Sequence, residues 1–269
     1  VPAITYTLSD GEGGSDTADL VITVDPVNDA PVASGTIADQ SDDDAGVVAG
    51  VATSSFFSDI DGDVLGYSAS GLPAGLSIDP VTGVISGTID NSASQGGPAS
   101  DGVYSVTVTA DDGNGGTVDQ TFTWTVANPA PVANDDAAST DEDVAVSGNV
   151  IGSGGAGDVA DSDADGDVLS VTTFVVAGDP ATYNAGDTAT IAGVGTVLLA
   201  SDGSYTFTPD ADWNGTVPAI TYTLSDGEGG SDTADLVITV DPVNDNPVAN
   251  DDAASTDEDV AVSGNVIGS

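Results

Sequence analysis

Lysine, arginine and histidine are all absent from this sequence, which has 45 acidic residues and a formal net charge of −45. No carboxylate can pair with a basic side chain, so each must face water, accept hydrogen bonds or bind a metal ion. Without lysine or arginine nothing neutralises phosphate, which argues against partners such as nucleic acid and anionic membranes. Cysteine is also absent, so the chain has no disulfides, no thiol chemistry and none of the ligands that zinc prefers.

Long apolar runs are missing too. No run approaches the roughly 18 residues of a membrane-spanning helix, and we expect no direct membrane insertion. Val1 is not an initiator methionine and begins no visible signal peptide, so we expect the chain to be an interior piece of a longer protein. Because 39% of its residues are hydrophobic, the chain can still build cores, unlike a disordered acidic tail.

Two long segments occur twice in the sequence. Residues 1–29 are identical to residues 217–245, and residues 132–153 are identical to residues 248–269, a period of 116 residues. Such repetition indicates an array of modules, each long enough for one β-sandwich. We predict the C-terminal part of a module A (1–30), a complete module B (31–130), a complete module A (131–246) and the N-terminal part of a further module A (247–269).

Alternating apolar and polar residues recur along the chain and predict strands. Glycine and proline interrupt them about every 8–12 residues, the spacing of sandwiches, and no segment keeps a helical period. We therefore predict an all-β fold of tandem β-sandwich modules in an elongated array. Trp124 is expected in a core, and Trp213 is expected to pin an acidic turn to a core. The predicted strands are 47–52, 64–69, 76–78, 84–88, 104–110, 121–126, 168–176, 188–191, 196–200, 204–208, 219–225 and 234–241.

Acidic residues gather in loops just before strands. Module B has Asp-Ile-Asp-Gly-Asp at residues 59–63, and module A has Asp-Ser-Asp-Ala-Asp-Gly-Asp at residues 161–167. Alternate aspartates can turn several oxygens toward one point, and Ca²⁺ accepts about six to eight oxygens in irregular geometry. A solvated, salt-adapted turn is the alternative for each loop alone. Recurrence at the same offsets in two dissimilar modules favours calcium as the cofactor.

Two familiar calcium motifs do not fit. Residues 161–166 match the start of an EF-hand loop, but Thr172 stands where that loop needs a bidentate glutamate, and strands are expected on both sides. The chain also lacks tandem Gly-Gly-x-Gly-x-Asp nonapeptides, so a calcium β-roll is not supported.

Three motifs of module A occur together in one known family. They are Asp-Ala-Asp-Gly at residues 163–166 before a strand, Ser-Asp-Gly at residues 225–227 after a strand, and Asn-Asp-Asn-Pro at residues 244–247. As a set they resemble the cadherin-type repeat in its bacterial form. In module B, residues 71–79 (GLPAGLSID) and 82–88 (TGVISGT) are similar to the dystroglycan-type cadherin-like, or Ig-like, domain of bacterial surface proteins.

Alternating modules of these two kinds resemble the repetitive region of large secreted adhesins of the RTX type. The resemblance implies an extracellular protein at a bacterial surface, with calcium at junctions formed by one module, the linker and the next module. It implies these ligands: Asn28, Asp29, Asp59, Asp61, Asp63, Asp111 and Asp112 at the first junction; Asn128, Asp161, Asp163, Asp165 and Asp226 at the second; Glu142, Asp210, Asp212, Asn244, Asp245 and Asn246 at the last. The second linker has no aspartate, so we expect fewer or weaker ions there.

The leading functional hypothesis is a calcium-stiffened extender, or stalk, of an adhesin, whose partners are the neighbouring modules of the same chain. The alternative is homotypic association into a filament or biofilm matrix, by strand exchange between chains. An enzyme is disfavoured because paired carboxylates would have to act alone, and these acids lie in repeated turns rather than across a cleft. Carbohydrate stacking on Trp124 or Trp213 is a minor hypothesis.

Overall fold

The computed structural model describes residues 2–153, 155 and 157–267. The ends of the two predicted incomplete modules, at Val1 and at residues 268–269, lie outside the described residues, as do residues 154 and 156 of module A. The chain divides into two compact units. Unit 1 comprises Val1–Val132, Asp161–Ser170 and Leu224–Asp232, and unit 2 comprises Ala133–Ala160, Val171–Thr223 and Thr233–Ser269.

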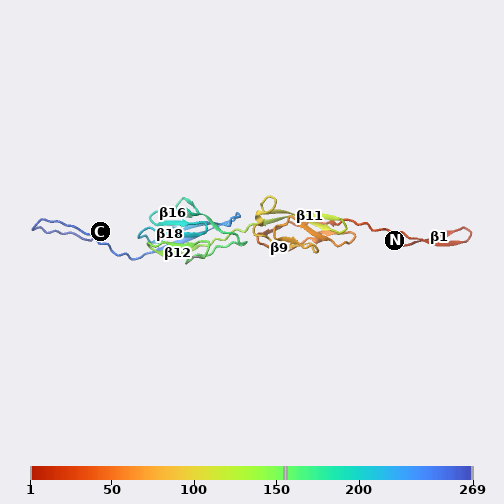
Figure 1. Ribbon diagram of the computed structural model, residues 1–269, viewed down its shortest axis with the longest axis horizontal. Helices are drawn as coiled ribbons and strands as arrows, with labels where there is room; N and C mark the ends of the chain where they lie inside the picture. Colours follow the sequence, from red (N-terminus) through yellow and green to blue (C-terminus); the bar gives the residue numbers. More distant parts are fainter. Residues whose placement is uncertain (1, 154, 156, 268–269) are drawn as a thin grey trace. The chain divides into compact units, whose positions relative to one another are not determined.

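The first sandwich is built from module B, and strands β9 and β11 mark it in Figure 1. Its larger sheet has the order β4 (Gln40–Asp43), β11 (Thr117–Ala127), β10 (Val103–Asp111) and β7 (Gly66–Ser70). Its smaller sheets contain β5 (Val47–Ala52), β9 (Val84–Thr88) and β8 (Leu76–Ile78), and the pair β3 (Val32–Ala33) and β6 (Phe57–Ser58). Two 3₁₀ turns, η1 (Ser54–Phe56) and η2 (Ala93–Gln95), complete the elements of this sandwich.

The core of the first sandwich is centred on Trp124, which is fully buried. Alternate residues of β11 point inward, so Phe122 and Val126 are buried beside it. The indole nitrogen of Trp124 donates a hydrogen bond to Asp42 Oδ2 at 3.0 Å. Trp124 is therefore a core residue, as predicted, and this rules out the minor hypothesis that it stacks on carbohydrate.

The second sandwich is built from module A. One sheet has the order β12 (Asp136–Asp141), β21 (Ser231–Asp241), β20 (Ile220–Ser225), β14 (Ser170–Val176) and β15 (Thr182–Asn184), with β19 (Gly215–Thr216) paired to β21. The other has the order β13 (Val146–Asn149), β18 (Ser204–Pro209), β17 (Gly195–Leu199) and β16 (Thr188–Ile191). Tyr222, fully buried, donates from its hydroxyl to the Asn134 carbonyl at 3.0 Å. Trp213 is only partly buried in its turn.

The N-terminal residues show what the same sequence does outside a sandwich. They form a hairpin of β1 (Ile4–Ser9) and β2 (Ser15–Leu20) in which every residue is exposed. In the identical residues of β20 and β21, the apolar side chains are buried. Strand β2 ends at Leu20, whereas β21 continues to Asp241 because residues 236–241 pair with the parallel strand β12. The tertiary partner therefore decides both burial and strand length.

The prediction of an all-β sandwich fold is confirmed. Predicted strands 47–52, 76–78 and 84–88 coincide with β5, β8 and β9 in their bounds. Strands β7 and β14 begin two residues later than predicted, because Val64 and Val168 belong to the acidic loops and are 87% and 85% exposed. Strands β4 and β12 were not predicted, since their acidic sequences do not alternate. Among the described residues no helix is long and apolar enough to span a membrane.

The duplicated sequence allows a matched test of core packing. Leu236 is fully buried, whereas Leu20, its identical counterpart, is 50% exposed. Leu236→Ala should lower the free energy of unfolding of the second sandwich by about 2–5 kcal/mol, and Leu20→Ala should change it by less than about 0.5 kcal/mol. Urea unfolding followed by tyrosine and tryptophan fluorescence measures both. Equal effects of the two substitutions would contradict the assignment of the core.

Candidate metal centres

The loop before β7 folds around one aspartate. Asp59 Oδ1 accepts hydrogen bonds from the backbone N–H groups of residues 61, 62 and 63, at 2.8, 3.1 and 3.3 Å. Gly62 supplies the left-handed turn with a φ of 81°. Carboxylate oxygens of Asp59, Asp61 and Asp63 lie within 4.8 Å of one another, and we call this group cluster 1. Asp59 Oδ2 is buried and has no hydrogen-bond partner.

The loop before β14 repeats this geometry. Asp163 Oδ1 accepts the backbone N–H groups of residues 165, 166 and 167 at 3.1, 3.1 and 3.3 Å. The oxygens of Asp163, Asp165 and Asp167 also lie within 4.8 Å of one another, and we call them cluster 2. In each loop one oxygen of the first aspartate holds the backbone, and its second oxygen stays available to a ligand.

A glycine-rich turn stands beside each cluster and fixes a further aspartate. Asp112 Oδ1 accepts the N–H groups of Asn114 and Gly116 at 2.7 and 2.9 Å. Asp226 Oδ1 accepts those of Glu228 and Gly230 at 2.8 and 3.0 Å. Both aspartates are almost completely buried. We call each cluster together with its turn a head: head 1 contains cluster 1, and head 2 contains cluster 2.

A linker asparagine binds each head through the remaining oxygen of that aspartate. Asn28 Nδ2 donates to Asp112 Oδ2 at 2.9 Å, and Asn128 Nδ2 donates to Asp226 Oδ2 at 2.8 Å. The Asn28 amide lowers the pKa of Asp112, with further lowering by backbone N–H groups against the effect of burial. Both predicted linker residues are therefore in contact with their predicted heads.

The two linkers differ at the next position. The backbone N–H of Asp29 donates to Asp61 Oδ2 at 2.8 Å. Pro129 stands at the equivalent place in the second linker and has no N–H to donate. Asp165, the counterpart of Asp61, is 9% exposed and both of its carboxylate oxygens lack a hydrogen-bond partner. Burial first and the Asp163 carboxylate second raise the pKa of Asp165 to about 7.

A third group lies in unit 2. Oxygens of Asp143, Asp212 and Asp245 lie within 4.8 Å of one another, and we call them cluster 3. Asp212 N–H donates to Asp143 Oδ1 at 3.0 Å. Glu142 is buried beside them, and its carboxylate accepts hydrogen bonds from Val243 N–H and Asn214 Nδ2. Burial, followed by the charges of Asp212, Glu142 and Asp143, raises the pKa of Asp245.

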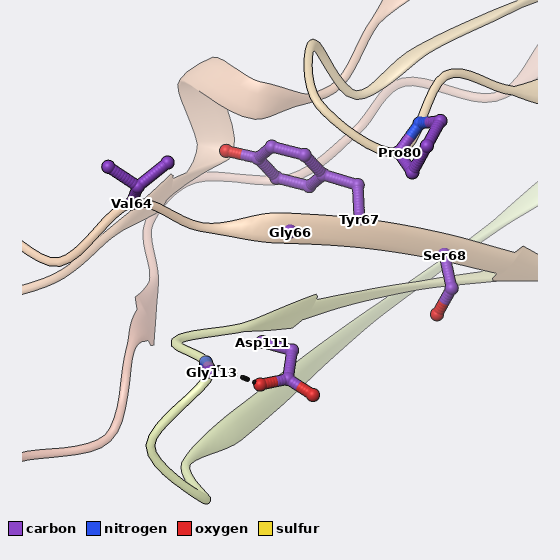
Figure 2. Close-up of a pocket in the computed structure, with 7 residues that line it drawn as sticks. All are labelled: Val64, Gly66, Tyr67, Ser68, Pro80, Asp111 and Gly113. Atoms are coloured by element: carbon purple, nitrogen blue, oxygen red, sulfur yellow. Dashed lines mark hydrogen bonds between the residues drawn. The ribbon is translucent and has the colours of Figure 1, made fainter.

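Several predicted ligands are not part of the three clusters. Asp111 accepts the N–H of Gly113 at 2.7 Å, and Figure 2 shows it beside a shallow hollow with Tyr67 and Pro80. Ser225 plays the same part in the other turn, where its hydroxyl accepts the N–H of Gly227 at 3.1 Å. Asp161 and Asp210 are predicted carboxylate ligands that none of the three clusters includes. Asn244 donates from its amide to the Asp245 carbonyl at 3.2 Å.

Two members of the clusters, Asp167 and Asp143, are not among the ligands predicted from the sequence. Asp167 could have been found, because it aligns with Asp63 when the two acidic loops are matched residue by residue. Asp143 was passed over in favour of the adjacent Glu142. Asp143 and Asp212 both have left-handed backbones, with φ of 64° and 58°, and sequence reasoning gave no signal for that conformation.

The donors in these clusters fit a hard divalent cation. Every side-chain ligand is a carboxylate or amide oxygen, which Ca²⁺ accepts in irregular geometry. Two carboxylates about 5 Å apart repel each other by roughly 3 kcal/mol at an effective dielectric constant of about 20. The buried oxygens without partners in clusters 1 and 2 are the atoms that a cation would satisfy.

The fold and these loops define the chain as a tandem of β-sandwich domains with acidic heads. Residues 30–127 match the family model described as "Putative Ig domain", and residues 128–242 match the model described as "Bacterial cadherin-like domain". The first sandwich is therefore similar to Ig-type domains, and the second is similar to bacterial cadherin-like domains. No curated protein matches the chain.

Solved structures with similarity to the chain include two cadherin ectodomains. Drosophila N-cadherin EC1-4 is 15% identical, with a TM-score of 0.35 over 81% of this chain and 50% of that one. Human protocadherin-24 EC1-2 is 17% identical, with a TM-score of 0.34 over 82% and 100%. An endo-fucoidan hydrolase of glycoside hydrolase family 107 is 19% identical, with a TM-score of 0.34 over 90% and 35%. The chain thus spans between a third and a half of the first structures it matches.

Close packing of a linker against its head can be tested at Gly230. A Cβ there would clash with Asp226 Oδ2 and lie 3.0 Å from the Cα of Ala130. At Gly14, its identical counterpart in the exposed hairpin, a Cβ would clash in the same way with Asp10 Oδ2, but no linker atom is among its nearest neighbours. Gly230→Ala should lower the free energy of unfolding by about 1–3 kcal/mol, and Gly14→Ala by less than about 0.5 kcal/mol. Chemical denaturation of both variants measures these changes. Equal losses in the free energy of unfolding would refute linker packing as the cause.

The raised pKa of Asp165 predicts a pH dependence for the metal-free chain. Between about pH 4 and pH 7 the folded chain binds more protons at Asp165 than the unfolded chain does, so the free energy of unfolding rises as the pH falls through this window. In a chelator, the melting temperature should therefore increase from about pH 7 to about pH 5. Asp165→Asn should flatten this dependence, and an unchanged slope in that variant would contradict it.

Proposed function

We propose that this chain is a calcium-binding extender region of a secreted or cell-surface bacterial adhesin. Cadherin-like and Ig-like domains support an adhesive or extracellular repeat role. The observation that carries the calcium proposal is the repeated coupling of linker and head. Asn28 and Asn128 each bind the buried aspartate that stands beside a cluster of three carboxylates.

The ligands fall into sets defined by this coupling. In head 1, Asp59, Asp61, Asp63 and Asp112 would bind the ion with Asn28 and Asp29 of the linker. In head 2, Asp163, Asp165, Asp167 and Asp226 would bind it with Asn128. In unit 2, Asp143, Asp212 and Asp245 would bind it beside Glu142. When bound, Ca²⁺ supplies the positive charge that the sequence lacks.

Stiffening follows from this arrangement. A linker whose asparagine and head share one ion loses rotational freedom that a bare linker would keep. Cation binding to the folded state also adds to stability, by about 2.7 kcal/mol for one site at roughly 100 times its Kd. The parent adhesin, its RTX character and the neighbouring modules as partners belong to the same proposal.

Homotypic association is the second candidate, and one observation favours it. The apolar residues of the hairpin β1–β2 are exposed, with Leu8 70% exposed, while the identical residues of β20 and β21 are buried. This hairpin could complete a sandwich in another copy of the chain by strand exchange. A concentration-dependent mass in sedimentation equilibrium would support it, and a monomer at all concentrations would refute it.

We infer that the chain does not act as an enzyme. The charged side chains are all carboxylates, and the described ones that cluster lie in turns that recur between modules rather than facing each other across a cleft. Bacterial cadherin-like domains are also a non-catalytic family. The Tyr67 hollow is open and shallow (Figure 2), and it has no opposed pair of acids.

The calcium proposal is tested by removing one carboxylate from a head. Asp226→Asn should bind Ca²⁺ more weakly and raise the melting temperature less on calcium addition than the wild type does, because it removes one anionic ligand. Asp10→Asn is the matched control, since Asp10 caps the identical turn in the N-terminal hairpin, where the described residues form no acidic cluster.

Calorimetric melting with and without a chelator, together with the Stokes radius, measures the outcome. The wild type should melt higher in calcium and change its radius, and Asp10→Asn should behave like the wild type. If calcium leaves both the melting temperature and the radius of the wild type unchanged, the proposed function is wrong.

A further inference from the structure

Head 1 and head 2 differ at one position within otherwise equivalent turns. Residues 112–116 read Asp-Gly-Asn-Gly-Gly, and residues 226–230 read Asp-Gly-Glu-Gly-Gly. In both turns the third residue donates its backbone N–H to the first aspartate, at 2.7 Å from Asn114 and 2.8 Å from Glu228. The two side chains therefore start from the same place relative to their clusters.

Asn114 satisfies the last aspartate of cluster 1 directly. Its Nδ2 donates to Asp63 Oδ2 at 2.8 Å. Glu228 has no N–H in its side chain, so it cannot do the same for Asp167, the counterpart of Asp63. Glu228 Oε2 and Asp167 Oδ2 are both buried and without a hydrogen-bond partner. Head 2 therefore has the carboxylate of Glu228 at the position where head 1 has the amide of Asn114, which donates a hydrogen bond to its cluster.

The backbone of Glu228 is fixed on both sides. Its N–H is bound to Asp226, and its carbonyl accepts a hydrogen bond from Gln95 Nε2 at 2.9 Å. Its Oε2 is buried, and burial first, followed by the charges of Asp167, Asp44 and other nearby carboxylates, raises the pKa of Glu228. The side chain is therefore held at head 2 and not free in solvent.

An independent observation points to a ligand at this head. Asp165 is 9% exposed, lies within cluster 2, and has no hydrogen-bond partner on either carboxylate oxygen. Eight buried side-chain oxygens of the described residues lack a partner, and head 2 with its linker holds six of them: Asn128 Oδ1, Asp163 Oδ2, Asp165 Oδ1, Asp165 Oδ2, Asp167 Oδ2 and Glu228 Oε2. Head 1 holds one, Asp59 Oδ2.

We propose that head 2 binds one more divalent cation than head 1, held between Asp167 and Glu228. The all-oxygen donors select a hard cation, and Ca²⁺ fits their irregular arrangement. The inference rests on the proposed function, because it adds an ion to a calcium-binding head. It also reverses the expectation, drawn from the linker alone, that this junction binds fewer ions.

Counting bound calcium by native mass spectrometry tests the proposal on the whole chain. Glu228→Asn restores the residue of head 1 and should bind one Ca²⁺ fewer than the wild type. Glu12→Asn is the control, because Glu12 occupies the identical turn of the N-terminal hairpin and belongs to none of the clusters found among the described residues. It should bind the wild-type number.

The reciprocal variant keeps the test independent of any folding defect in Glu228→Asn. Asn114→Glu should bind one Ca²⁺ more than the wild type, because it removes the amide from Asp63 and adds a carboxylate. If Glu228→Asn binds the wild-type number and Asn114→Glu gains none, the extra position is refuted while the proposed function stands. If the wild type binds no calcium at all, both are refuted.

Discussion

Every carboxylate in this chain must be stabilised without a single basic side chain. The fold meets this constraint by giving one oxygen of an aspartate to backbone N–H groups, as Asp59 and Asp163 do in their loops. The second oxygen then points into a cluster of like charges, where two carboxylates about 5 Å apart repel each other by roughly 1 kcal/mol even at the dielectric constant of water. A bound cation would relieve that repulsion, as protonation of Asp165 does in part near neutral pH.

The linkers also stabilise carboxylates of the heads. Each donates an asparagine amide to a buried aspartate that is itself held by a glycine-rich turn. The turn forms independently, since Asp10 accepts the same backbone hydrogen bonds in the exposed N-terminal hairpin. What distinguishes a head from that hairpin is the adjacent acidic loop and the linker. The two heads then differ at two positions: head 1 has Asp29 and Asn114 where head 2 has Pro129 and Glu228. These differences set how many carboxylate oxygens in each head lack a hydrogen-bond partner.

Much of this could be read from the sequence, and the exceptions have physical causes. Alternation located the central strands, and the recurrence of the acidic loops located clusters 1 and 2. The edge strands β4 and β12 were not predicted, because their sequences are acidic and each pairs in parallel with a strand distant in the sequence. Asp143 escaped because its position depends on a left-handed backbone. The burial of Leu236 and the exposure of Leu20, in identical sequences, show that local pattern cannot specify tertiary environment.

Hydrogen–deuterium exchange with and without calcium measures whether cations stabilise the acidic heads. If they do, exchange is slower in calcium at the backbone amides of residues 59–63, 163–167 and 226–230. Residues 10–14, identical in sequence to 226–230 but without a cluster beside them, should exchange at the same rate in both conditions. Equal rates at the heads with and without calcium, or equal protection of residues 10–14, would show that cations do not stabilise the heads.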